Sequence, residues 1–330
     1  MRRREFIAGL GGAAIWPLAA RAQQTRLVGL LMNGNANELP IQANVKAFSE
    51  RLGQLGWVEG KNLRLEVRWN GGNAEGARNF AAELVGLRPA AIATASTTNL
   101  LALRNATNTI PIVFLQVSDP VAQGFVPNLT KPGGNATGFS AYEFSIGGKW
   151  LELLKEMSPG LTHVAVMSNH DTSPQSKFFI RAIEAAASGF NIRVDQASVR
   201  SMADIESTIE KTAGQPGGGL IVPTDSYTRV RGERIAELTL KHRVPAIGAF
   251  PEFIDKGGLL FYGPSAADNL VEQFRYAAGY VDRILKGTKP GDLPVQSTNK
   301  FVLFINRKTA ATLGLEIPPK LLFTADRVIE

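Results

Sequence analysis

The chain has 330 residues, of which 44% are hydrophobic and 20% charged, and its net charge is +7. This length suits about two average domains and is ample for well-buried cores. The sequence has no cysteine, and no two of its three histidines have the i, i+4 spacing of a helical metal site. It therefore excludes disulfides and cysteine-bound metals, and it predicts neither a metal nor a cofactor.

The first 22 residues, MRRREFIAGLGGAAIWPLAARA, have the parts of an export signal. Basic residues precede an apolar run over residues 7–18, and a small-residue cleavage site, Ala20-Arg21-Ala22, follows it. The sequence Arg3-Arg4-Glu5-Phe6-Ile7 resembles the twin-arginine pattern. The apolar run is well short of the roughly 20 residues that a membrane-spanning helix needs, so we predict cleavage near Ala22 and delivery to the periplasm. The alternative, a frayed amphipathic helix, is disfavoured by the glycines and the proline in the run.

Part of the positive charge belongs to this signal. Without residues 1–22 the chain loses four arginines and one glutamate, so the net charge falls from +7 to +4. Nucleic-acid binding would need lysines and arginines concentrated on one face, and no such run follows Arg4. No later segment is apolar enough to span a bilayer, and no cysteine follows the signal to carry a lipid. We therefore expect a soluble monomer with no nucleic-acid partner.

From Arg26 onward, short runs rich in Val, Ile and Leu alternate with segments of helical period, as in βαβ units with a parallel sheet. Four strands and three crossover helices would form one doubly wound lobe. The strands are predicted over residues 26–32, 62–70, 90–96 and 110–117, and the helices over 38–56, 74–88 and 97–108. Residues 119–138, punctuated by prolines and glycines, are predicted to connect this lobe to the next.

A second alternation of the same kind follows and predicts a second lobe of the same architecture. Its helices are expected over residues 146–158, 174–188, 202–213 and 227–242, and its strands over 163–169, 191–199, 219–225 and 245–250. The tail adds a strand over 258–265, a helix over 265–286, a loop over 289–294 and a last strand over 301–306.

The tail also predicts how the lobes are joined. If its helix packs on the first lobe and its last strand on the second, the chain crosses between the lobes three times. The first lobe would then comprise residues 25–138 and 264–290, and the second residues 139–263 and 295–330. Phe139-Ser140 and Gly263-Pro264 are placed to be hinge segments.

Three segments carry a resemblance to a known family: GQLGWVEGKNLRLEVRW, DPVAQGFVPNLTKPGGNATGFS and the tail KGTKPGDLPVQSTNKFVLFINRKTAATLGLEIPPKLLFTADRVIE. Together they resemble the ABC-transporter substrate-binding proteins once labelled as domain of unknown function 534, which include tryptophan-type binding proteins. The likeness covers essentially the whole chain after the signal. It implies a type I periplasmic binding fold, in which two Rossmann-like α/β lobes with parallel sheets hold a ligand between them.

Ligands of open α/β sheets bind beyond the carboxyl ends of the strands, which names the candidate contacts of the first lobe. Ser96-Thr97-Thr98 begin a helix directly after a strand, so their N–H groups and hydroxyls could hold a carboxylate. The alternative is that these residues simply cap the helix. The other candidates of this lobe, together with the segment that follows it, are Asn33, Asn35, Ser118, Asp119 and Ser140.

In the second lobe the strand ends give Asn169, Asp225 and Tyr227. Asp225 could face a ligand ammonium group, Tyr227 could stack on its side chain, and Asn169 could offer an amide. Asp225 could equally be the N-cap of the helix that follows it. Phe250 and Tyr262 end later strands, where they could form either the ligand wall or the core.

These observations predict a periplasmic receptor that captures a small polar ligand, an amino acid or a related carboxylate, and passes it to an inner-membrane permease with its ATPase. No catalytic residue is expected. A two-lobe racemase or lyase acting on a small carboxylate is the alternative. Such racemases need two opposed proton-transfer groups, often cysteines, and this sequence has no cysteine. A ligand-responsive transcription regulator would need a helix-turn-helix before the first strand, where only the signal lies. Phosphate-loop, dinucleotide and nucleophile-elbow motifs are also absent from the sequence.

Overall fold

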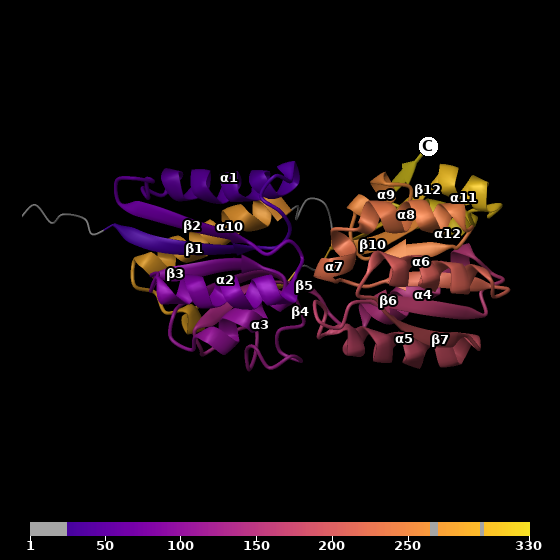
Figure 1. The fold of residues 1–330 in the computed structure, drawn as a ribbon, viewed down its shortest axis with the longest axis horizontal. Helices are drawn as coiled ribbons and strands as arrows, with labels where there is room; N and C mark the ends of the chain where they lie inside the picture. The colour runs from indigo at the N-terminus through magenta and orange to yellow at the C-terminus, as the bar shows by residue number, and fades with distance from the viewer. Residues whose placement is uncertain (1–24, 265–269, 298–299) are drawn as a thin grey trace, which may run out of the picture.

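The structure is a computed structural model that describes residues 25–264, 270–297 and 300–330. The predicted export signal lies outside the described residues. The described residues fold into two α/β lobes, each built on its own mainly parallel sheet (Figure 1).

The first lobe has a six-stranded, fully parallel sheet in the order β11-β5-β4-β3-β1-β2. One apolar core lies under α1 and α10, and a second lies under α2 and α3 on the opposite face. The strands are β1 (Arg26–Met32), β2 (Leu63–Trp69), β3 (Ala91–Ala95), β4 (Ile112–Ser118), β5 (Ala136–Tyr142) and β11 (Gln296–Ser297). The helices are α1 (Leu39–Gln54), α2 (Ala74–Gly86), α3 (Thr97–Ala106) and α10 (Leu270–Leu285), and the 3-10 turn η2 (Pro290–Asp292) precedes β11.

The second lobe repeats this plan with a seven-stranded sheet in the order β13-β12-β10-β9-β8-β6-β7. Among the described strands of this sheet, every neighbouring pair is parallel except β10 with β12. The strands are β6 (His163–Ser168), β7 (Arg193–Ser198), β8 (Gly218–Val222), β9 (Ala246–Gly248), β10 (Leu260–Pro264), β12 (Phe301–Asn306) and β13 (Arg327–Ile329). The helices are α4 (Ile146–Met157), α5 (Ser176–Phe190), α6 (Met202–Ala213), α7 (Ser226–Arg229), α8 (Gly232–Lys241), α9 (Glu252–Asp255), α11 (Arg307–Leu313) and α12 (Pro319–Thr324).

The chain passes between the sheets after β5, after β10 and after β11. Figure 1 shows α10 lying among the elements of the first lobe, although it follows nearly all of the second lobe in sequence. Its partner in packing is α1, where Phe274 meets Phe48 edge to face. The helix of the tail therefore does pack on the first lobe, and β12 does join the second.

The first crossing comes later than we predicted, because residues 136–142 form β5 of the first sheet rather than part of a connection between lobes. All seven residues of β5 are buried, and β11 pairs with it at the edge of the same sheet. Phe139-Ser140 thus lie inside a strand. The first lobe extends to Tyr142 and takes residues 296–297 as well, so the boundaries at 138 and 290 need to move.

Two further differences concern the second lobe. The helix expected over residues 227–242 is divided into α7 and α8, which meet at Val230 and Arg231. A final strand, β13, was not predicted because it is only three residues long and pairs in parallel with β12.

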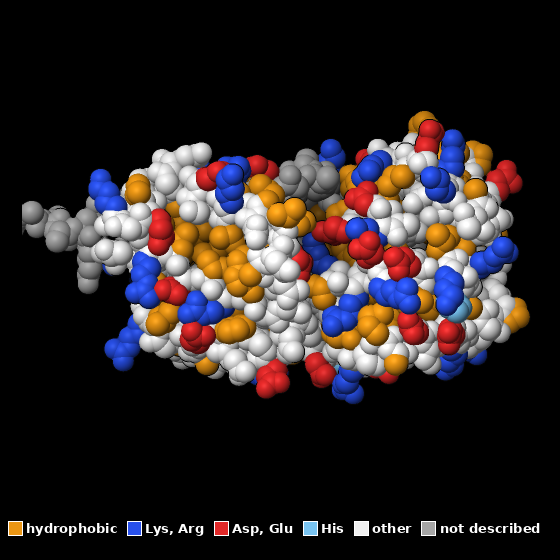
Figure 2. Space-filling model, turned by 45° about the horizontal axis from the view of Figure 1, so that its top comes forward, with side chains coloured by type: hydrophobic (Ala, Val, Ile, Leu, Met, Phe, Trp, Pro, Cys, Tyr) orange, Lys and Arg blue, Asp and Glu red, His pale blue; other side chains and the backbone are white. Residues whose placement is uncertain are grey.

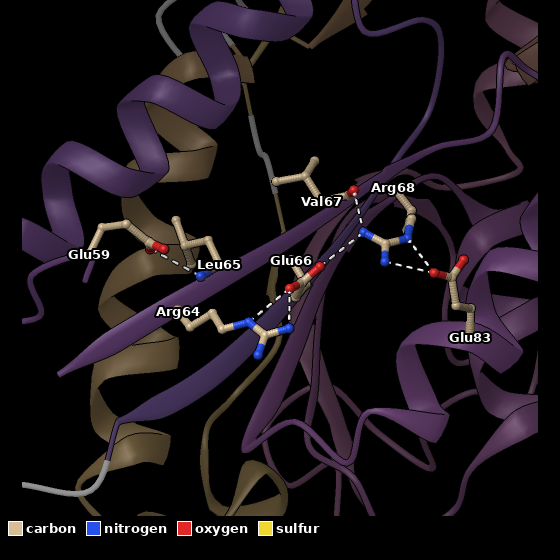
Figure 3. Close-up of polar contacts among 7 residues, drawn as sticks. All are labelled: Glu59, Arg64, Leu65, Glu66, Val67, Arg68 and Glu83. Carbon is tan, nitrogen blue, oxygen red and sulfur yellow. Dashed lines mark hydrogen bonds and ion pairs between the residues drawn. The ribbon is translucent and has the colours of Figure 1, made fainter. Parts of the chain in front are cut away.

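The outer edge strand of the first sheet, β2, carries a chain of alternating charges (Figure 3). Glu66 lies between Arg64 and Arg68, at 2.5 Å and 3.1 Å, and Arg68 also binds Glu83 of α2. The Glu59 carboxylate accepts a hydrogen bond from the backbone N–H of Leu65 at 3.0 Å. Charged side chains and an occupied backbone donor discourage this edge from pairing with another strand.

Candidate functional site

The carboxyl ends of the two sheets face a shared cavity of about 480 Å³ between the lobes. From the first lobe it is lined by residues that follow β1 and β3 and by side chains of β4 and β5. From the second lobe it is lined by residues 172–175 and by the segments after β8 and β9. This volume lies in the usual range of small-molecule sites.

Much of the cavity wall is apolar. Two aromatic rings, those of Phe250 and Phe261, lie in the wall of the second lobe and are buried. The other apolar residues of the lining are Met32, Pro40, Ile41, Ala43, Ala95, Val230, Ala249, Pro251, Pro264 and Val271. A wall of this kind suits a ligand with an apolar body and few polar groups.

The amino end of α3 supplies hydrogen-bond donors at the cavity. Ser96 is the N-cap and has a φ of 94°, a left-handed conformation that is strained for a residue other than glycine. Its hydroxyl accepts a hydrogen bond from the N–H of Asn99 at 3.3 Å, so it caps the helix as the alternative reading supposed. The N–H groups of Thr97 and Thr98 lie in the first turn of the helix, where no carbonyl of the helix can accept their hydrogen bonds. Both residues line the cavity. A helix terminus of this kind favours an anion.

Asp225 is buried and its carboxylate accepts four hydrogen bonds from its own lobe. Oδ1 accepts from the Thr172 hydroxyl at 2.5 Å and from the N–H of Tyr227 at 3.0 Å. Oδ2 accepts from the N–H groups of Asn169 at 2.9 Å and Thr228 at 3.3 Å. Burial raises the pKa of the Asp225 carboxyl, while these four hydrogen bonds act in the opposite direction. The residue caps α7, as the alternative to the counter-ion role supposed, and it also fixes the 169–172 loop.

Arg229 joins the lobes across the cavity. Its guanidinium donates to Gln116 Oε1 of β4 at 2.7 Å and to Glu252 Oε1 of α9 at 2.7 Å. Gln116 lies at a register shift between β4 and β5 and has a φ of 52°, which turns its side chain out of the strand's regular alternation. Burial acts to raise the pKa of the Glu252 carboxyl, but attraction to Arg229, together with the hydrogen bonds from its own backbone N–H and from Arg229, outweighs burial, so this pKa lies below its ordinary value.

Three more hydrogen bonds cross directly between the lobes beside the cavity. The Thr98 hydroxyl donates to the Thr172 carbonyl at 2.5 Å, and the hydroxyls of Ser118 and Thr224 are 3.3 Å apart. The Tyr142 hydroxyl of β5 also donates to the Ala249 carbonyl that follows β9. With the Arg229–Gln116 bond, the described residues therefore make four direct hydrogen bonds between the lobes at the cavity. The cleft is therefore closed in this structure.

Two amide side chains of the lining keep an unused acceptor. Gln175 of the second lobe is 3% exposed, and its Nε2 donates to the Thr224 carbonyl at 3.1 Å. Its Oε1, and the Oδ1 of Asn33 in the first lobe, are buried and accept no hydrogen bond from the described residues. Buried acceptors of this kind are uncommon in folded proteins.

The structure brings six of the thirteen predicted site residues to the cavity wall. They are Asn33, Ser96, Thr97, Thr98, Asp225 and Phe250. Ser118 and Asn169 lie one layer behind: Ser118 contacts Thr224 as above, and the Asn169 carboxamide accepts from the N–H of Asp171 at 2.8 Å.

The remaining five predicted residues have other roles. The Asn35 amide donates to Glu38 at 2.7 Å, and Asp119 accepts from the N–H of Ala122 in its own turn. The Ser140 hydroxyl donates to a carbonyl of the neighbouring strand β4. The Tyr227 ring lies 3.6 Å from the Arg231 guanidinium, and Tyr262 stacks on Phe301, as its alternative core role supposed.

Sequence reasoning missed several residues of the lining, among them Gln116, Tyr142, Gln175, Arg229 and Glu252. Gln116 lies inside β4, and no residue pattern marks the bulge that turns it toward the cleft. Tyr142 ends β5, a strand that we did not predict. Arg229 lies four residues after Asp225, the cap of α7, and Gln175 lies seven residues after the end of β6. Both positions are farther along the chain than a search of strand ends reaches. Extending that search by one helical turn would have found Arg229.

A second hollow, of about 420 Å³, lies on the surface of the first lobe between α1 and β2. Apolar side chains gather on this lobe in Figure 2, while positive and negative side chains are interspersed over the visible face. Val45, Leu65 and Trp69 line the hollow, with polar residues at its margin. No described residue lines both this hollow and the inter-lobe cavity.

Residues 25–264, 270–297 and 300–330 contain no cluster of histidine and acidic side chains that could hold a metal ion. None of their helices is both long enough and apolar enough to cross a membrane.

The chain matches the model of the family described as ABC transporter substrate binding protein over residues 39–329. A tyrosine-binding protein from Clostridioides difficile (strain R20291) is 27% identical over 272 residues, which are 82% of this chain and 76% of the relative. A conserved domain protein from Vibrio cholerae is 27% identical and has a TM-score of 0.80, with 92% of this chain and 100% of that chain covered. A Streptococcus pneumonia ABC domain in complex with L-Trp is 21% identical and has a TM-score of 0.77, with 93% and 100% covered.

The chain therefore belongs to the family of ABC transporter substrate-binding proteins. The predicted family and the two-lobe α/β fold of type I periplasmic binding proteins are confirmed. The family consists of binding proteins rather than enzymes, so the racemase or lyase alternative is set aside.

Proposed function

We propose that this substrate-binding protein captures an α-amino acid with an aromatic side chain, tryptophan or tyrosine, in the inter-lobe cavity. It carries the amino acid outside the cytoplasm to a permease and its ATPase. The observation that supports the proposal best is the cavity itself, in which the donors of a helix terminus lie next to a largely apolar wall.

The ligand's carboxylate is assigned to the N–H groups of Thr97 and Thr98 at the start of α3. An anion at this position is favoured by the unpaired N–H groups and by the helix dipole. The same end of α3 forms one of the contacts that cross the cleft, through the Thr98 hydroxyl. A carboxylate there would be held where the two lobes meet.

The aromatic side chain is assigned to the apolar wall, where Phe250 and Phe261 are joined by aliphatic residues of both lobes. Burying apolar surface stabilises a complex by roughly 25 cal/mol per Å² before the costs of binding. The name of the Clostridioides difficile relative, a tyrosine-binding protein, favours the same class of ligand. The Streptococcus neighbour of similar fold, which holds L-Trp, is in keeping with it.

The mechanism we propose is a shift between an open and a closed arrangement of the lobes. The open form exchanges ligand, and the closed form gains stability only when one ligand contacts both lobes at once. Micromolar capture requires about 8 kcal/mol. The transporter would then recognise the closed form.

A thermal-shift screen of residues 23–330 tests the proposal, with L-tryptophan, L-tyrosine, other amino acids, short peptides and sugars as ligands. A ligand that binds only the folded state stabilises it by about 2.7 kcal/mol at a hundredfold excess over Kd. We expect L-tryptophan or L-tyrosine to raise the melting temperature most. Tryptamine, which lacks the carboxylate, should bind at least about tenfold more weakly, since hydrogen bonds to a charged group contribute about 1.5–3 kcal/mol. Stabilisation by a sugar and by no amino acid would refute the proposal.

A further inference from the structure

We propose that Asn33 and Gln175, one from each lobe, recognise the amino group of the ligand through their unused amide oxygens. The inference rests on the proposed function, because it takes the ligand to be an α-amino acid. It replaces Asp225, which the sequence suggested for this role.

The orientation of Gln175 is set by its surroundings. Its Nε2 donates to the Thr224 carbonyl at 3.1 Å, so the other end of the carboxamide must be the acceptor oxygen. The side chain is buried and lines the cavity, yet that oxygen accepts nothing from the described residues. A buried acceptor without a donor loses its water and receives no hydrogen bond in return. A donor brought by the ligand would restore the bond.

Asn33 occupies a position beside the carboxylate site. Strands β1 and β3 are parallel neighbours, with Leu31 opposite Thr94, and continuing this register places Asn33 beside Ser96 at the start of α3. Adjacent strands are about 4.8 Å apart. Asn33 and the start of α3 are therefore neighbours at one edge of the sheet, and both line the cavity. The amino and carboxylate groups of an α-amino acid are attached to the same carbon atom. Their binding sites, an acceptor for the amino group and donors for the carboxylate, must therefore lie close together.

The carboxylates of the lining are already engaged with the protein. Asp225 accepts four hydrogen bonds, Glu38 accepts two from Asn35, and Glu252 accepts one from Arg229. Their negative charge favours an ammonium group in the cavity, while Asn33 and Gln175 offer it oxygens that have no other donor.

Burial of an unpaired atom would not by itself indicate a ligand. His163, Ser168 and His242 also carry buried side-chain atoms without a hydrogen-bond partner, and none of the three lines the cavity. Asn33 and Gln175 differ from them because they lie in the wall of one cavity, on opposite lobes. An ammonium group bound to both would hold the lobes together.

The test compares each ligand with its analogue that lacks the amino group. L-tryptophan is paired with indole-3-propionate, and L-tyrosine with 3-(4-hydroxyphenyl)propionate, and calorimetric titration gives the affinity ratio for each protein variant. One hydrogen bond to a charged group changes affinity by about ten- to a hundredfold. We expect the wild-type ratio to be about 100 or more, and Gln175→Met to reduce it at least about tenfold.

Gln116→Met is the matched control, because it makes the same substitution in the same cavity at a glutamine whose oxygen already binds Arg229. It is expected to weaken both members of a pair together and to leave their ratio unchanged. Asn33→Leu repeats the test from the other lobe, so that a misfolded Gln175→Met protein does not end the experiment. Both affinities in a ratio are measured on the same variant, so a substitution that weakens the binding of both ligands equally leaves the ratio unchanged.

The outcomes separate the two proposals. If the wild type binds the amino acid and neither Gln175→Met nor Asn33→Leu lowers the ratio, this inference is wrong and the proposed function stands. If the wild type binds no aromatic amino acid, the proposed function is wrong and this inference falls with it. A ratio that collapses in Gln175→Met or Asn33→Leu but not in Gln116→Met supports both.

Discussion

Replacing Asp225 by asparagine should lower the stability of the fold far more than the loss of an ordinary helix cap would. A simple N-cap predicts an almost silent change, because asparagine caps a helix about as well as aspartate. Asp225 differs, because its two oxygens together accept four hydrogen bonds in a buried setting. An asparagine side chain has one acceptor oxygen in place of two.

The structure indicates which hydrogen bonds the asparagine side chain would make. Its NH₂ group would take the Oδ1 position, because there the Thr172 hydroxyl can turn round and accept a hydrogen bond. The N–H of Tyr227 would then lose its acceptor, and the bonds from Asn169 and Thr228 would no longer be made to a charged group. An unpaired buried donor costs about 1–3 kcal/mol, and the weakened bonds add to it. We expect the free energy of unfolding to fall by about 2–4 kcal/mol.

Urea unfolding of residues 23–330 measures this loss, provided that the slope of free energy against urea is unchanged. Asp204→Asn is the matched control, because Asp204 also accepts two N–H groups, of Arg200 and Ser201, but at a partly exposed cap of α6. Water can replace those bonds, so its cost should stay below about 1 kcal/mol. Equal losses in the two variants would refute the argument from the buried network.

The same variant separates the two candidates for the amino-group site. If Asp225 were the counter-ion of the ligand, Asp225→Asn should reduce the affinity for an amino acid by roughly 30-fold or more, and the affinity for its des-amino analogue much less. If the carboxylate only shapes the loop, both affinities should change together. A selective loss of amino-acid binding would return the role to Asp225.

Three further predictions concern closure, acidity and export. Saturating L-tryptophan should reduce the radius of gyration measured by small-angle scattering, and an unchanged profile with ligand bound would show that the cleft is closed beforehand. Because the Glu252 pKa is depressed below 4.5, its ion pair with Arg229 stabilises the fold above that pH, and this stability is lost as the pH falls through the folded pKa. Glu252→Gln should thus be less stable than the wild type near pH 7, and urea unfolding should show the gap narrowing in acid; a constant gap would contradict this. Replacing Arg3 and Arg4 by lysine should leave precursor in the cytoplasm, whereas normal periplasmic accumulation would indicate the general secretory route.

The fold could be predicted from the sequence because hydrophobic period and strand length are local properties. Strands such as β1 and β4 are continuous apolar runs, as buried parallel strands are expected to be. Strand β5, ATGFSAY, escaped because small and polar residues fill it, although every residue in it is buried. Gly138 shows why they are small: a Cβ there would lie 1.9 Å from the Phe114 carbonyl oxygen of β4.

The candidate site could be predicted only where it follows a strand directly. Ser96-Thr97-Thr98 were found in this way, since they are the first residues after β3. Whether Asp225 would bind a ligand or its own lobe depended on Thr172 and Asn169, more than fifty residues away in sequence. The role of a buried polar side chain depends on how many of its hydrogen bonds the fold already supplies, and no linear pattern records that number.

The contacts across the cleft and the unused oxygens together explain why closure would depend on ligand. The four direct hydrogen bonds between the lobes, one of them made by the charged Arg229, favour closure by roughly 3–7 kcal/mol. Closing also removes water from the oxygens of Asn33 and Gln175, which costs about 1–3 kcal/mol each while they lack a donor. These contributions are of similar size and opposite sign, so the empty protein would be balanced between open and closed. A ligand that donates to both oxygens removes the cost while the contacts remain, and it needs only a few kcal/mol of differential binding to shift the population.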